Sequence, residues 1–214
     1  MIFRQPTITT GVNADSGLYP LTFAVIEGET ESSWRWFISR IYELIANVHQ
    51  NKRITFISDQ MKGIPNALKP GWPSPHNHRY CLRHIRANFQ KEFKDKVLHN
   101  LLWEVGCATN PDVYKAKRVE LIVACEDADT YIENSSKDQE QQWALSRDGG
   151  HRLCMMTTNT SESFNDVFKG ARALPLQALI VRIFFRLVKF FRTRREEAEQ
   201  WNMLLTPKLS LIHI

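Results

Sequence analysis

The segment that most constrains the fold is a short apolar run at residues 54–58, because an amphipathic pattern precedes it and Asp59 follows it directly. Over residues 34–48 apolar side chains recur at steps of three and four, which predicts a helix with one packed face. Ser32 or Ser33 is expected to cap its start. A strand, a helix and a second strand in this order favour a right-handed crossover and parallel pairing, so we expect an α/β fold.

The residues before this helix predict an antiparallel hairpin. Segments 7–13 and 18–28 are rich in β-branched and aromatic side chains, and the Ala-Asp-Ser-Gly sequence between them contains turn formers. If the second of these strands also pairs in parallel with residues 54–58, the sheet is mixed. A proline-rich stretch at 69–78 then leads into a further short strand, expected at 79–82.

The remainder of the chain reads as mostly helical. We expect a helical insertion at about residues 85–146, a helix that starts at Ser161 and ends at Gly170, and a last helix over 174–200. The domain prediction is one domain over residues 1–205, truncated at its N-terminus, followed by a tail at 206–214.

Composition narrows the class of protein. The chain has 214 residues, 43% of them hydrophobic and 24% charged, which is enough to bury a core. Its net charge of +5 and pI near 9.1 are compatible with a polyanionic partner. The four scattered cysteines fit a reducing compartment better than a disulfide framework. No stretch approaches the ~18 consecutive apolar residues of a membrane helix, so no membrane partner is predicted.

Two carboxylates stand out as candidates for metal chemistry. Asp59 comes at the carboxyl end of a buried strand, where open α/β sheets bind ligands. Glu162 lies near the N-terminus of a predicted helix, and a hard divalent ion prefers such oxygen ligands. The alternatives are structural. Asp59 would cap a helix over residues 60–68, and Glu162 would be a solvated first-turn glutamate favoured by the helix dipole.

Three motifs in order carry a resemblance. They are Ile-Ser-Asp ending at Asp59, the CxxH pair Cys81 and His84, and an NxxESxN sequence with Glu162 between Asn159 and Asn165. With the segments around them, they resemble the catalytic core of Mutator-like (MULE) transposases over nearly the whole chain. The resemblance implies a ribonuclease H-like fold with an Asp, Asp, Glu triad that binds metal. Asp59 would be its second aspartate and Glu162 its glutamate, while Asn159 and Asn165 have no assigned role.

The same resemblance leaves one ligand without a counterpart. The family's first aspartate lies on a strand before the segment matching residues 7–21, and the chain is expected to begin too late to contain it. Asp15 matches a turn instead and is expected to be noncatalytic. We therefore expect a fragment or derivative of a DDE-type transposase that is inactive alone. The alternative is a noncatalytic DNA-binding or regulatory protein derived from a transposase.

The resemblance also implies surroundings for an intact family member. It implies Mg²⁺ or Mn²⁺ as the cofactor, DNA as the partner and nuclear localisation. It is also compatible with a homo-oligomer. Cys81 and His84 alone cannot complete a four-ligand zinc site, so no zinc is predicted. We expect the two side chains to be packed or hydrogen-bonded instead. Four cations are candidates for phosphate contacts: Arg79, Arg83, Arg86 and Lys91. The alternative is that they belong to a solvated helix face.

Overall fold

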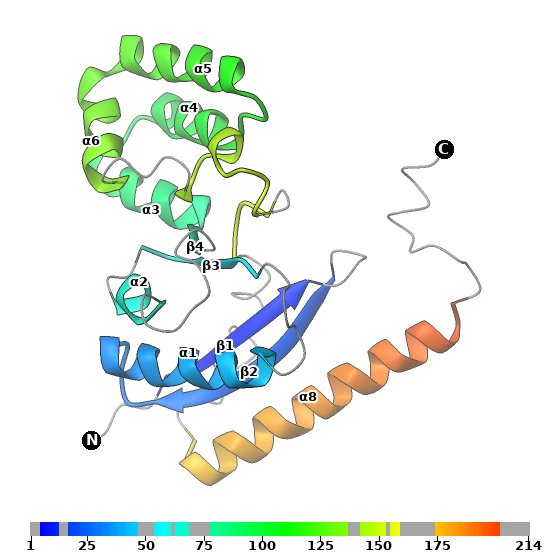
Figure 1. Ribbon diagram of the computed structural model, residues 1–214. Coiled ribbons are helices and arrows are strands. Elements are labelled where there is room, and N and C mark those ends of the chain that lie inside the picture. Colours follow the sequence, from blue (N-terminus) through cyan, green and yellow to red (C-terminus); the bar gives the residue numbers. More distant parts are fainter. Residues whose placement is uncertain are drawn as a thin grey trace. The chain divides into compact units, whose positions relative to one another are not determined.

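The computed structural model describes residues 5–12, 17–46, 54–60, 63–68, 78–136, 142–152, 155–158 and 174–201 (Figure 1). The chain divides into two compact units. The central unit is Thr30–Thr158, and the terminal unit combines Met1–Glu29 with Asn159–Ile214. Helices and short sheets occur together, so the predicted α/β class is confirmed, whereas the single domain over 1–205 stays a prediction.

The terminal unit consists of a hairpin and a long helix. Strands β1 (Gln5–Val12) and β2 (Leu18–Ile26) pair antiparallel, as the sequence predicted, with an irregularity between Thr9 and Thr10. Helix α8 (Leu176–Glu199) confirms the predicted last helix. Its buried side chains Leu179 and Ile183 pack with the strand side chains Ile8, Phe23 and Val25.

The central unit begins with helix α1 (Glu31–Ala46), which packs against the short helix α2 (Gly63–Leu68). Ile38 and Trp34 of α1 meet Ile64 and Leu68 of α2. The capping prediction was wrong, because the helix starts at Glu31 and leaves Ser32 and Ser33 inside its first turn. Thr30 caps it instead, since its hydroxyl accepts a hydrogen bond from the backbone N–H of Ser33 at 3.2 Å.

The sheet prediction needs a second correction. Strand β3 (Phe56–Ser58) pairs in parallel with β4 (His78–Tyr80), and within the described residues β1–β2 and β3–β4 form separate two-stranded sheets. The expected mixed sheet joining β2 to residues 54–58 is therefore not observed there. The crossover rule gives handedness to parallel strands that share a sheet, but it does not determine which strands share one.

The predicted helical region is confirmed, although it starts earlier than residue 85. It contains α3 (Leu82–Glu92), α4 (Lys96–Cys107), α5 (Pro111–Ala124), α6 (Glu126–Ser136) and the single turn η3 (Leu145–Arg147). Asp95 and Asn110 cap α4 and α5 through their side chains. The shared core lies among these helices and includes Leu82, Phe89, Leu102, Leu121 and Trp143.

No helix in the described part of the chain is long and apolar enough to cross a membrane. Helix α8 shows why: its apolar positions are interrupted by Arg182, Arg186 and Lys189. The helix is packed through its buried side chains Leu179 and Ile183.

Candidate metal and nucleic-acid site

Asp59 lies at the carboxyl edge of the parallel strand pair. Ser58 is opposite Tyr80 in the register, so Asp59 and Cys81 are the next residues along the two strands. The backbone N–H of Cys81 donates to the carbonyl oxygen of Ser58 at 2.7 Å, which extends the pairing by one step. Helix α2 begins only at Gly63, so Asp59 is not the N-cap of a helix over 60–68. In open α/β sheets, ligands bind at this carboxyl end of the strands.

Cys81 also joins this edge to a segment far along the chain. Its sulfur accepts hydrogen bonds from the backbone N–H and the hydroxyl of Thr158, both at 3.3 Å. The backbone N–H of Leu82 donates to the carbonyl oxygen of Met156 at 2.9 Å. Residues 155–158 therefore run beside the junction between β4 and α3. Asn159, Glu162 and Asn165 lie outside the described residues, so their placement stays a prediction.

The surroundings of Cys81 set its acidity. Burial by itself raises the pKa of the thiol, but hydrogen bonds from the side chain of His84 and from Thr158 lower it more, to about 7. Stabilising the charged form by hydrogen bonding is the general cause of such a shift. In the described part of the chain, no three His, Cys, Asp or Glu side chains are grouped to hold a metal ion. The observed contacts give Cys81 and His84 a hydrogen-bonded role, and the absence of zinc remains a prediction.

One side of α3 carries cations beside the Asp59 edge. Arg83 and Lys91 are exposed on this helix. The Lys91 ammonium donates to the amide oxygen of Asn88 at 3.0 Å, and the Asn88 amide nitrogen donates to the side-chain oxygen of Gln60 at 3.4 Å. This chain of polar contacts links Lys91 on α3 to Gln60, the residue that follows Asp59.

The other two predicted phosphate contacts have different surroundings. Arg79 is only 3% exposed, and its guanidinium donates to the carbonyl oxygens of His78 at 3.0 Å and Asp148 at 2.8 Å. Burial lowers its pKa, although Asp148 opposes this shift. Arg86 is half-buried, lies over the Trp103 ring at 5.7 Å, and donates to an oxygen of a neighbouring helix. Arg83 and Lys91 are thus the more accessible pair for a polyanion.

Sequence reasoning missed a buried ion pair behind β4. The side chains of Asp148 and Arg152 are both fully buried, with 3.4 Å between carboxylate Oδ2 and guanidinium Nε. The Asp148 carboxylate also accepts from the backbone N–H groups of Gly150 and Arg152. Gly149 and Gly150 have φ values of 66° and 77°, which glycine adopts readily. The Asp-Gly-Gly sequence signalled this turn, but nothing in it indicated burial.

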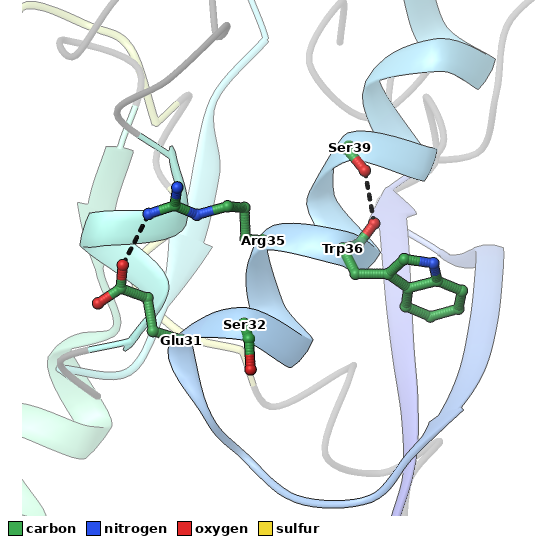
Figure 2. A pocket seen from close by; sticks show the side chains of 5 residues that line it. All are labelled: Glu31, Ser32, Arg35, Trp36 and Ser39. Carbon is green, nitrogen blue, oxygen red and sulfur yellow. Dashed lines mark hydrogen bonds and ion pairs between the residues drawn. The ribbon is translucent and has the colours of Figure 1, made fainter.

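A separate surface pocket lies along α1 (Figure 2). It is lined by Glu31, Ser32, Arg35, Trp36 and Ser39. Glu31 and Arg35 already pair with each other at 2.7 Å, as Figure 2 shows. Its charged groups satisfy one another and it contains none of the predicted site residues, so it is not the candidate site.

The comparison with protein families matches residues 3–88 to the MULE transposase domain. This range contains Asp59, Cys81, His84 and Arg83, and it ends before Lys91 and the NxxESxN motif. No curated protein matches the chain. The resemblance drawn from the sequence is therefore confirmed over residues 3–88, where the chain is similar to the MULE transposase domain.

Proposed function

We propose that the chain derives from a DDE-type DNA transposase with a ribonuclease H-like fold, and that Asp59 and Glu162 bind Mg²⁺ or Mn²⁺. Its partner is DNA, and its expected compartment is the nucleus. The family match over residues 3–88 supports a transposase origin. The observation that carries the site is the position of Asp59 at the carboxyl edge of the β3–β4 pair.

The chain segment leading to Glu162 supports the pairing of the two carboxylates. Thr158 is hydrogen-bonded to Cys81, and Cys81 is hydrogen-bonded to Ser58, the residue before Asp59. Glu162 is four positions after Thr158, and four residues span at most about 14 Å when fully extended. The length of chain between Thr158 and Glu162 is therefore compatible with a metal site shared with Asp59.

The chemistry of the intact family explains why two carboxylates matter and why they do not suffice. In two-metal phosphoryl chemistry, ions about 3.5 to 4 Å apart activate the attacking oxygen and stabilise the leaving oxygen. In DNA transposition the attacking groups are water and then a 3′-hydroxyl. Without a residue matching the first aspartate, the ions lose a ligand and their alignment. We therefore propose that the 214-residue chain does not cut or join DNA by itself.

A noncatalytic DNA-binding or regulatory function is the second candidate. The exposed cations Arg83 and Lys91 on α3 favour it, because phosphate contacts need no metal geometry. The two candidates differ in what Asp59 does. If Asp59 is a metal ligand, its loss weakens Mn²⁺ binding, whereas a purely DNA-binding protein would be insensitive to that change.

Mn²⁺ binding to the purified chain, followed by electron paramagnetic resonance, tests the metal site. We expect Asp59→Asn and Glu162→Gln each to weaken binding by about tenfold or more, since each removes a charged oxygen ligand. Asp127→Asn is the matched control, because Asp127 is exposed on α6. Mn²⁺ affinity that is unchanged in Asp59→Asn would contradict the proposal.

Incubation with labelled duplex DNA and Mn²⁺ tests the lack of turnover, with Asp59→Ala and Glu162→Ala alongside. We expect no cleavage by the native chain. Cleavage that disappears in both variants would show that another carboxylate completes the triad, and Asp15 would be the first residue to examine.

Fluorescence anisotropy with duplex DNA tests the nucleic-acid surface. We expect weak binding without sequence preference. The double variant Arg83→Gln/Lys91→Gln should lower the slope of log affinity against log salt by about 2, because two phosphate contacts are lost. The control with the same charge change is Arg192→Gln/Arg195→Gln, whose guanidinium groups already pair with Glu196 and Glu199. Equal effects of the two double variants would exclude α3 as the DNA-binding face.

A further inference from the structure

Cys81 makes specific contacts with two distant parts of the chain. Its backbone N–H reaches Ser58, beside Asp59, and its sulfur accepts both hydrogen-bond donors of Thr158. Positions 81 and 158 are 77 residues apart in the sequence. One residue therefore joins the strand end that carries one proposed metal ligand to the segment that leads to the other.

The burial of Cys81 determines how it can act. Its relative exposure is 0%, so its sulfur lies away from solvent and from any bound DNA. A direct nucleophilic role would require access to a reacting atom, which this position lacks. Cys81 can therefore affect the proposed site only through the groups that it contacts. The most distant of these in sequence is Thr158.

The contacts with residues 155–158 fix direction as well as position. Met156 accepts a hydrogen bond from the backbone of Leu82, and Thr158 donates two hydrogen bonds to the sulfur of Cys81. These attachments lie two residues apart, so they hold the segment at two points along its length. A segment held at one point can pivot, whereas attachment at two points fixes the direction of residues 156–158.

We propose that Cys81 is a positioning residue that holds the segment leading to Glu162 in register with the strand end that carries Asp59. This inference rests on the proposed function. In this role the cysteine of the CxxH pair supports the proposed site without binding the metal itself. His84, one turn along α3, supports the sulfur by hydrogen bonding to it.

The test compares two measurements on the full chain. In Cys81→Ala, the Thr158 N–H and hydroxyl lose their acceptor, so hydrogen exchange should accelerate about tenfold or more at the Thr158 amide. Exchange in the α4–α5 core should stay unchanged. Mn²⁺ affinity should fall about tenfold at a temperature where circular dichroism shows the variant to be folded. Cys107→Ala, in α4, is the matched control and should change neither measurement.

Two milder changes keep the test decisive if Cys81→Ala does not fold. Thr158→Val removes only the hydroxyl donor and should weaken Mn²⁺ binding less than the loss of the sulfur does. Thr158→Ser keeps both donors and should restore the native affinity. A valine variant with native Mn²⁺ affinity and native exchange of segment 155–158 would overturn the positioning role.

The outcomes separate this inference from the proposed function. If Cys81→Ala is folded and binds Mn²⁺ like the native chain, while Asp59→Asn does not bind, the positioning role is wrong and the metal site stands. If Asp59→Asn binds Mn²⁺ like the native chain, the metal site is wrong and the positioning role falls with it.

Discussion

At the scale of single residues, His78 gives the central unit a dependence on pH. Its side chain is 6% exposed, and its Nε2 lies 2.8 Å from the Ser58 hydroxyl. Burial, reinforced by the charge of Arg79, lowers its pKa from 6.5 to about 4. As pH falls, the unfolded chain therefore takes up this proton before the folded chain does. The stability that His78 contributes is full above pH 6.5 and is lost as the pH falls through 4.

We expect the free energy of unfolding to fall by about 3 kcal/mol more in the native protein than in His78→Gln when the pH is lowered from 7 to 4. Urea denaturation of both proteins at several pH values measures this difference. Carboxylate titration contributes to both curves and cancels in the comparison. Identical pH dependence in the two proteins would show that the pKa of His78 is the same in the folded and unfolded states.

At the scale of elements, Gly106 sets how closely α4 approaches the start of α3. A Cβ atom at this position would lie 2.5 Å from Cδ1 and 2.7 Å from Cδ2 of Leu82. Leu82 is fully buried in the helical core and has little room to move. Because glycine has no Cβ atom, helices α3 and α4 can make this contact.

We expect Gly106→Ala to lower the free energy of unfolding by about 1 to 2 kcal/mol, because overpacking outweighs the ~1 kcal/mol that alanine normally gains in a helix. In a Leu82→Ala background the clash is gone, and the same change should be neutral or stabilising. Denaturant unfolding of the four proteins in this cycle provides the measurement. Additive effects would show that the two side chains do not meet.

The elements also show what the sequence could and could not reveal. The hairpin, α1, the helices from α3 to α6 and α8 follow from local periodicity, and the structure has them all. The partner of β3 did not follow, because a three-residue strand has too little pattern of its own to specify pairing. Thr30 was missed as a cap because two serines follow it closely and are equally good capping residues.

In the candidate site, too, local features could be predicted from the sequence but long-range contacts could not. The place of Asp59 after a strand was predictable, because the end of an apolar strand is a local signal, and the β3–β4 pairing puts it at the sheet edge. The interior position of Arg79 was not predictable, because it depends on Asp148, 69 residues away. Thr158 was not singled out either, since its contact with Cys81 is also long-range.

At the scale of the whole molecule, the central unit is one continuous stretch and the terminal unit is built from two. The packed clusters of α3–α6 and of α1 with α2 use only side chains from within Thr30–Thr158. A unit with its own core and a continuous chain meets the usual conditions for independent folding.

We expect a fragment of residues 30–158 to be helical and to unfold in one cooperative transition, measured by circular dichroism. Leu102→Ala, at a fully buried position, should destabilise it by about 2 to 4 kcal/mol, whereas Val119→Ala, at an exposed position, should have a small effect. Non-cooperative melting of the fragment would mean that the terminal unit is required for its stability.

The hairpin of the terminal unit has a consequence for how the protein is made. Strands β1 and β2 precede their packing partner α8 by about 150 residues, which corresponds to roughly 8 to 30 s of ribosomal synthesis. During that interval Ile8, Phe23 and Val25 lack the α8 side chains that cover them in the finished fold. The central unit can mature while it is still being translated, but the hairpin must wait for release of the distal helix. These apolar strand side chains therefore stay uncovered by α8 for most of the time that the chain takes to be made.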